Sequence, residues 1–144
     1  MKVLFDTSVL YPALDPVHPL YERCKSLIAE LEKEHSIVVL NTHLIAELFN
    51  NLSKQPRMPT PLAVINTVVR DLAKRYTGVE LTMNDYLLAI DRCTKLGLRG
   101  GVIYDALHFQ AAIKANVDII YTGNLRDFKR LMTDEITFTI KSPL

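Results

Sequence analysis

The chain has 144 residues, 49% of them hydrophobic and 23% charged, which is the composition of one soluble globular domain spanning residues 1–144. The 17 Lys and Arg residues nearly balance the 16 Asp and Glu residues, and this net charge of +1 argues against a basic protein that coats nucleic acid. Two cysteines and the absence of any apolar run near the ~18 residues of a membrane span exclude a disulfide scaffold and a membrane protein. We therefore expect a cytoplasmic protein with buried thiols and no membrane partner.

Short apolar runs and amphipathic stretches alternate along the chain. The predicted strands cover residues 2–5, 37–40, 79–81, 119–121 and 137–140. The predicted helices cover residues 8–14, 16–31, 42–52, 60–75, 82–97 and 103–115, and a last helix follows Asn124. Asp15, Thr42 and Asn124 are the expected N-caps of their helices, and Thr82 with Asp85 has the spacing of a capping box. Residues 54–61 contain three prolines and are interpreted as a loop between helices.

Strands that are separated by helices predict an α/β fold, here a three-layer α/β/α sandwich around a mostly parallel sheet. In such folds a ligand binds in the crevice outside the carboxyl ends of the strands. Functional side chains are therefore expected where the strands end and the next helices begin.

Four acidic residues lie in such positions or inside apolar stretches. Asp6 directly follows the first strand, Glu47 and Asp105 interrupt apolar runs, and Asp127 lies in the first turn of the last helix. Each residue alone has a structural alternative, because helix N-termini favour Asp6, Asp105 and Asp127, and a buried Arg would explain Glu47. Jointly they point to one edge of the sheet, where carboxylates ~4 Å apart would repel by roughly 4 kcal/mol per pair.

Such a cluster requires a neutralising cation. Oxygen ligands select hard ions, so Mg²⁺ is the expected cofactor and Mn²⁺ is expected to substitute for it. Zinc is disfavoured, because the two cysteines are far apart and the histidines lack zinc-site spacing. If the four acids share one crevice, 16 minus 4 leaves 12 acids against 17 bases, so the remaining surface carries +5. The near-neutral total is therefore compatible with a nucleic-acid substrate.

Four segments in chain order resemble the motifs of the PIN domain family, which includes the VapC toxins of toxin–antitoxin pairs. The segments are VLFDTSVL, HLIAELFN, IYDALHFQAA and YTGNLRDF. The resemblance covers essentially the whole chain. It implies an endoribonuclease in which Asp6, Glu47 and Asp105 bind Mg²⁺ and Asp127 completes the site directly or through water. It further implies supporting roles for the polar residues Thr7, Ser8, Thr122 and Asn124.

The resemblance also suggests partners. Phosphate contacts usually come from Arg and Lys, and the candidates near the motifs are Arg99, Arg126, Lys129 and Arg130, although plain solvated surface explains each of them equally. His108, three residues after Asp105, is interpreted as a packing or supporting residue. In VapC-like proteins, helices comparable to residues 42–75 bind an antitoxin protein and a second copy of the chain. Here the same helices are equally explained as a pair that closes the domain's own core.

Other interpretations remain open at this point. A PIN-like module could bind RNA or protein without cutting, and a PIN nuclease could process RNA without being a toxin. A haloacid dehalogenase-like phosphatase needs a second Asp where this chain has Ser8, and no GxGxxG motif follows the first strand to support dinucleotide binding.

Overall fold

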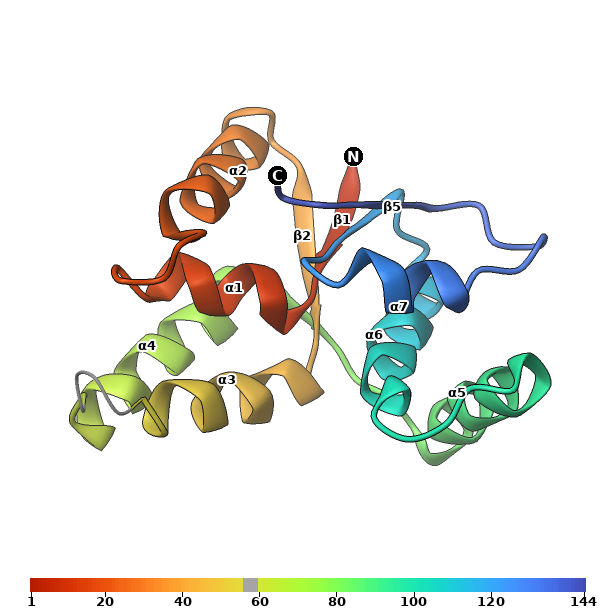
Figure 1. Cartoon of the computed structure of the whole chain (residues 1–144). Coiled ribbons are helices and arrows are strands. Elements are labelled where there is room, and N and C mark those ends of the chain that lie inside the picture. Colours follow the sequence, from red (N-terminus) through yellow and green to blue (C-terminus); the bar gives the residue numbers. More distant parts are fainter. Residues whose placement is uncertain (56–59) are drawn as a thin grey trace.

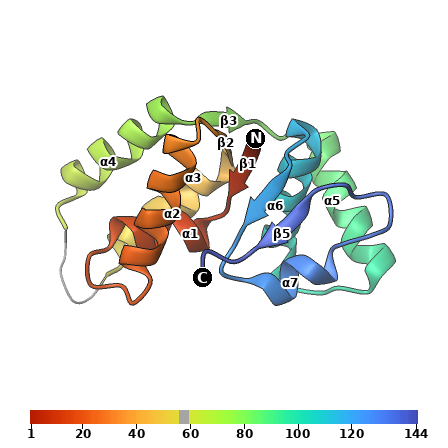
Figure 2. The same ribbon diagram turned by 90° about the horizontal axis from the view of Figure 1, so that it is seen from above.

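The computed structural model describes residues 1–55 and 60–144. Its described strands form one parallel sheet in the order β3-β2-β1-β4-β5 (Figures 1 and 2). The strands are β1 (Lys2–Phe5), β2 (Ile37–Asn41), β3 (Thr77–Val79), β4 (Ile119–Tyr121) and β5 (Thr139–Lys141). The helices are α1 (Thr7–Leu14), α2 (Tyr21–Lys33), α3 (His43–Ser53), α4 (Leu62–Arg75), α5 (Met83–Leu96), α6 (Val102–Ala115) and α7 (Leu125–Arg130).

Helices cover both faces of the sheet, which confirms the predicted α/β/α sandwich. Figure 2 shows α1 to α4 on one side of the strands and α5 to α7 on the other. Successive residues of a strand point to opposite faces, and in β1 this places Val3 and Phe5 in the core beneath α1 to α4 and Leu4 in the core beneath α5 to α7. Such strands are apolar throughout because neither face meets water.

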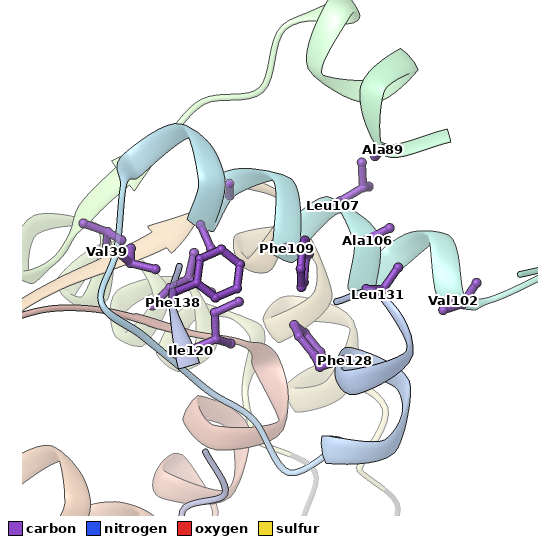
Figure 3. Close-up of a cluster of buried hydrophobic side chains, with 14 of the residues drawn as sticks. Val39, Ala89, Val102, Ala106, Leu107, Phe109, Ile120, Phe128, Leu131 and Phe138 are labelled. Carbon is purple, nitrogen blue, oxygen red and sulfur yellow. The ribbon is translucent and has the colours of Figure 1, made fainter. Parts of the chain in front are cut away.

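The core beneath α5 to α7 is rich in aromatic side chains. Phe109 of α6 meets Phe138 edge-on, with ring centroids 5.0 Å apart, and Phe128 of α7 packs into the same cluster (Figure 3). Phe109 and Phe128 are completely buried, so each contributes on the order of 1.5–3 kcal/mol of hydrophobic stabilisation. This packing fixes α6 and α7 against β4, and both helices begin at the edge where the strands end.

The start of the second helix differs from the prediction. Residues 16–20 form turns, and α2 begins at Tyr21. The Asp15 carboxylate accepts a hydrogen bond from the Val17 N–H and the His18 ring accepts one from the Leu20 N–H, so side chains satisfy the backbone where a helix was expected. A proline at position 19 also disfavours helical geometry for the residue before it.

Thr42 and Asn124 lie at the N-cap positions of α3 and α7, as predicted, but without the expected capping bonds. The Asn41 side chain accepts from the His43 N–H instead. The strand predicted at 79–81 lies at Thr77–Val79, and the one predicted at 137–140 lies at Thr139–Lys141.

Several local predictions are confirmed. The capping box of Thr82 and Asp85 is present, and both cysteines are buried free thiols. The predicted loop at 54–61 falls partly on residues 56–59, which lie outside the described residues. Within the described ranges, the helices are too short or too polar to cross a membrane.

Candidate active site

A cavity of about 460 Å³ opens where the strands end. Figure 1 shows β1 and β2 side by side, each leading into a helix at this edge, α1 after β1 and α3 after β2. Asp6 follows β1, Glu47 lies on α3, and Asp105 lies in the first turn of α6. These three carboxylates line the cavity together, as the sequence pattern predicted.

Asp6 is almost fully buried and is held by neutral donors. Its Oδ1 accepts from the Ser8 hydroxyl at 2.5 Å and from the Ser8 N–H at 3.1 Å, and its Oδ2 accepts from the Thr122 hydroxyl at 2.7 Å. The Ser8 hydroxyl in turn accepts from the Gly123 N–H at 2.7 Å. Burial raises the pKa of Asp6, and this effect outweighs the opposing influence of the His108 charge and of the hydroxyl donors.

Glu47 is surrounded by three donors. His43 Nδ1 and His108 Nε2 each lie 2.8 Å from Oε1, and the Thr7 hydroxyl donates to Oε2 at 3.1 Å. Burial alone would raise the Glu47 pKa, but the His108 hydrogen bond and charge and the His43 and Thr7 hydrogen bonds lower it to about 2. Glu47 is therefore ionised at neutral pH. Its partners are histidines and not the Arg that the sequence suggested as the structural alternative.

Asp105 and Asp127 are joined by one amide group. Asn124 Nδ2 donates to Asp105 Oδ2 at 3.0 Å and to Asp127 Oδ2 at 2.9 Å. The amide thus bridges two carboxylates, which explains why it does not cap α7. Burial and the negative charges of Asp6, Asp127 and Glu47 raise the Asp105 pKa to about 6, against a smaller opposing effect of His108.

The site carries excess negative charge. Across the described ranges, no Lys or Arg forms an ion pair with Asp6, Glu47 or Asp105. His108 is buried among them; burial lowers its pKa, but the Glu47 hydrogen bond and the charges of the three carboxylates raise it on balance. One imidazolium cannot neutralise three carboxylates, so the donor set and the raised Asp105 pKa fit a hard divalent cation.

The side chains are not closed around a single ion. Within residues 1–55 and 60–144, no three His, Cys, Asp or Glu groups converge closely enough to form a metal site. Both Asp6 oxygens and both Glu47 oxygens already accept hydrogen bonds from protein donors. The chemistry and the charge of the site therefore fit a divalent ion.

The PIN domain sequence model matches residues 3–132, which is most of the chain. The chain belongs to the PIN domain family. Among curated protein sequences, none matches it.

Solved structures support the same fold for this PIN domain. VapC20 of Mycobacterium tuberculosis, a toxin that cleaves the sarcin–ricin loop, is 19% identical with a TM-score of 0.73, covering 94% of this chain and 98% of its own. VapBC-1 from nontypeable Haemophilus influenzae is 17% identical with a TM-score of 0.70, covering 99% and 98%. VapBC2 from Rickettsia felis, bound to a DNA fragment from its promoter, is 18% identical with a TM-score of 0.67, again covering 99% and 98%. At such identities the likeness concerns the fold.

All eight polar residues of the predicted PIN motifs take part in the hydrogen bonds described above. Asp127 and Thr122 differ from the other six, because neither is among the described residues that line the cavity. Thr122 is buried, and Asp127 is connected to the cavity through Asn124.

The four basic candidates lie outside the cavity. Arg99, Arg126, Lys129 and Arg130 are all exposed, and none is a described lining residue. Arg130 pairs with Asp127 at 3.3 Å. Arg126, Lys129 and Arg130 lie on α7, the helix that carries Asp127, and Arg99 lies in the loop before α6, the helix that carries Asp105.

The contact of His43 with Glu47 was not predicted, and His108, which was predicted to be a packing or supporting residue, contacts Glu47 as well. His43 precedes Glu47 by four residues on α3, so helical spacing could have revealed this pair. The ring of His43 also stacks on Tyr104, with centroids 5.8 Å apart. His108 is 61 residues away from Glu47, and only the folded chain shows that contact.

Proposed function

We propose that this PIN domain is a Mg²⁺-dependent endoribonuclease and the toxin of a VapBC-type toxin–antitoxin pair. The observation that carries this proposal is the group of three buried or half-buried carboxylates in one cavity without a Lys or Arg counterion among the described residues. Family membership and the shared fold with VapC proteins support the same assignment.

Asp6, Glu47 and Asp105 would hold the ion, and Asp127 would complete the site through Asn124 or through water. Bound Mg²⁺ would polarise the scissile phosphate, lower the pKa of an attacking water and stabilise the leaving oxygen. The chain's own residues prepare the site for it. Ser8 and Thr122 fix the Asp6 carboxylate, and His43, His108 and Thr7 keep Glu47 ionised and oriented.

RNA hydrolysis by the purified protein tests the proposal. We expect cleavage with Mg²⁺ or Mn²⁺, no cleavage with EDTA, and at least a hundredfold loss in Asp6→Asn. Asp91→Asn on the exposed face of α5 is the matched control and should cleave like the wild type. Retained metal-dependent cleavage in Asp6→Asn would overturn the site assignment. The absence of both cleavage and carboxylate-dependent Mn²⁺ binding would favour a module that binds RNA or protein without cutting.

The toxin assignment has its own test. Expression of the wild type should arrest growth, whereas Asp6→Asn should not, and a co-expressed antitoxin should restore growth. Equal growth with wild type and Asp6→Asn would favour an RNA-processing nuclease. VapBC-1 and VapBC2 are solved as toxin–antitoxin pairs, which supports a small antitoxin as a partner here. The proposal further treats residues 1–144 as one domain and the protein as a homodimer in the cytoplasm. Arg99, Arg126, Lys129 and Arg130 would contact the RNA.

A further inference from the structure

The cavity is larger than the acid cluster requires. Six waters around a divalent ion occupy about 180 Å³ at about 30 Å³ each, which is less than half of the 460 Å³. The rest of the cavity extends between α1 and α3, which lie side by side as they lead away from the sheet (Figure 1). Its lining there comes from Tyr11, Pro12, His18, Leu20 and Asn51, and we call this part the outer pocket.

The outer pocket begins one helical turn beyond the acids. Tyr11 follows Ser8 by three residues on α1, and Asn51 follows Glu47 by four on α3. At 1.5 Å rise per residue, these steps place the pocket roughly 4.5–6 Å farther along each helix and on the same face as the acids. A nucleotide next to a phosphate held at the acids would therefore reach it.

The aromatic wall of the outer pocket is held rigidly. Tyr11 and His18 meet edge-on with ring centroids 5.9 Å apart. Gln55 Nε2 donates to the Tyr11 hydroxyl at 2.5 Å and to the buried Asp15 carboxylate at 2.6 Å, which ties the end of α3 to the end of α1. The Tyr11 hydroxyl thus accepts a hydrogen bond from Gln55 and keeps its own O–H to donate, and its ring offers a ligand an aromatic face.

Two further polar groups are available for recognition. His18 Nδ1 accepts from the Leu20 N–H at 3.0 Å, so the neutral ring carries its proton on Nε2 and can donate from there. The Asn51 carboxamide makes no hydrogen bond within the described part of the chain, although it lines the cavity. An amide that can both donate and accept, beside a ring N–H donor, can read the edge of a base.

The charge of the pocket selects the ligand class. Its described lining includes no Lys or Arg, and the adjoining carboxylates would repel a second phosphate. Aromatic rings, apolar Pro12 and Leu20 and an amide instead match an unpaired base, which proteins bind by stacking and by hydrogen bonds to its edges. We propose that Tyr11, His18 and Asn51 form a subsite for an unpaired RNA base next to the scissile phosphate, an inference that rests on the proposed function.

Cleavage mapping on RNAs that differ at one nucleotide beside the cut tests the subsite. Asn51→Leu keeps the side-chain size but loses the amide, and His18→Gln changes a second residue on a separate segment. We expect each variant to lose about tenfold in kcat/KM on the preferred RNA and to discriminate less at one position. Asn50→Leu, exposed on α3 and outside the cavity lining, is the matched control and should keep the wild-type preference.

Binding without cleavage separates this inference from the proposed function. In an Asp6→Asn background without metal, Asn51→Leu should weaken the binding of whichever single-stranded RNA homopolymer the Asp6→Asn protein binds most tightly, measured by fluorescence anisotropy, and Asn50→Leu should not. Unchanged preference and affinity in both Asn51→Leu and His18→Gln would overturn the subsite while leaving the nuclease assignment intact. Failure of the wild type to cleave RNA with any divalent ion would overturn the proposed function, whereas the binding comparison would still decide the subsite.

Discussion

His108 Nε2 lies 2.8 Å from Glu47 Oε1 and thereby joins the two helical layers of the sandwich at the edge of the sheet. Glu47 belongs to α3 on one face, and His108 belongs to α6 on the other. The His108 side chain is only 2% exposed, and its Nδ1 has no partner among the described residues. The strength of the contact between His108 and Glu47 therefore depends on the burial of His108 as well as on charge.

His108→Leu should destabilise the protein by about 1–3 kcal/mol. The substitution removes a buried, charge-assisted hydrogen bond. It also removes His108 as a positive charge, which is the only one among the described residues that contributes to the pKa shifts of Asp6, Glu47 and Asp105. Urea unfolding without metal measures the effect.

His43→Leu is the matched control, because His43 bonds the same Glu47 oxygen. It is 27% exposed, so its removal should change the free energy of unfolding by less than about 1 kcal/mol. Equal effects of the two substitutions would show that burial of His108 has no special part in stability.

Divalent-ion binding should depend on pH through Asp105. Its carboxyl must be ionised to act as a ligand, and its pKa is raised to about 6 by burial and by neighbouring negative charge. Mn²⁺ affinity should therefore increase as the pH rises from 5 to 7, as measured by calorimetry. A flat profile over this range would contradict the proposed part of Asp105 in the site.

The raised Asp105 pKa should also make the stability of the metal-free protein depend on pH, and this stability should fall as the pH rises. A folded pKa above the unfolded value near 4 means that the folded state binds more protons between about pH 4 and 6. Stability from this group is therefore present at low pH and is lost as the pH rises through about 6. Asp105→Asn removes the cost of keeping an ionised carboxylate at this position. The melting temperature of the variant should therefore exceed that of the wild type at pH 7, and the difference between the two melting temperatures should be smaller at pH 5.

Gly123→Ala should weaken divalent-ion binding and RNA cleavage. An added Cβ would lie 3.3 Å from both the Cβ and the Oγ of Ser8, so the hydroxyl that bonds Asp6 would have to move. Gly101→Ala is the control, since a Cβ there meets nothing within 4 Å. The ratio of the two Mn²⁺ dissociation constants measures the effect, and equal values would mean that the Ser8 contact does not position Asp6.

Local sequence signals predicted much of this structure. The capping box of Thr82 and Asp85 involves residues three apart, and the apolar strands need only their own side chains to be recognised. The helix predicted to begin at Pro16 is absent there because the Asp15 and His18 side chains accept hydrogen bonds from the backbone N–H groups that follow them. Such bonds compete with helix formation, and hydrophobic periodicity does not reveal them.

The grouping of the candidate residues could be predicted from the sequence, whereas their hydrogen-bond partners could not. Asp6 and Asp105 could be grouped because strand ends and helix starts share one edge of a parallel sheet, and Glu47 was selected because it interrupts an apolar stretch. The partners of Glu47 and the bridging role of Asn124 depend on contacts between distant segments, here 61 and 19 residues apart. Such contacts follow from packing, so a single sequence offers no local signal for them.

The most direct test is the initial rate at which equal concentrations of wild type and Asp105→Asn cleave one RNA with Mg²⁺ at pH 7. We expect EDTA to abolish cleavage by the wild type, and we expect Asp105→Asn to lose at least a hundredfold in rate with its fold preserved by circular dichroism. Cleavage at the wild-type rate by a folded Asp105→Asn variant would contradict the assignment of Asp105 to a metal-dependent nuclease site.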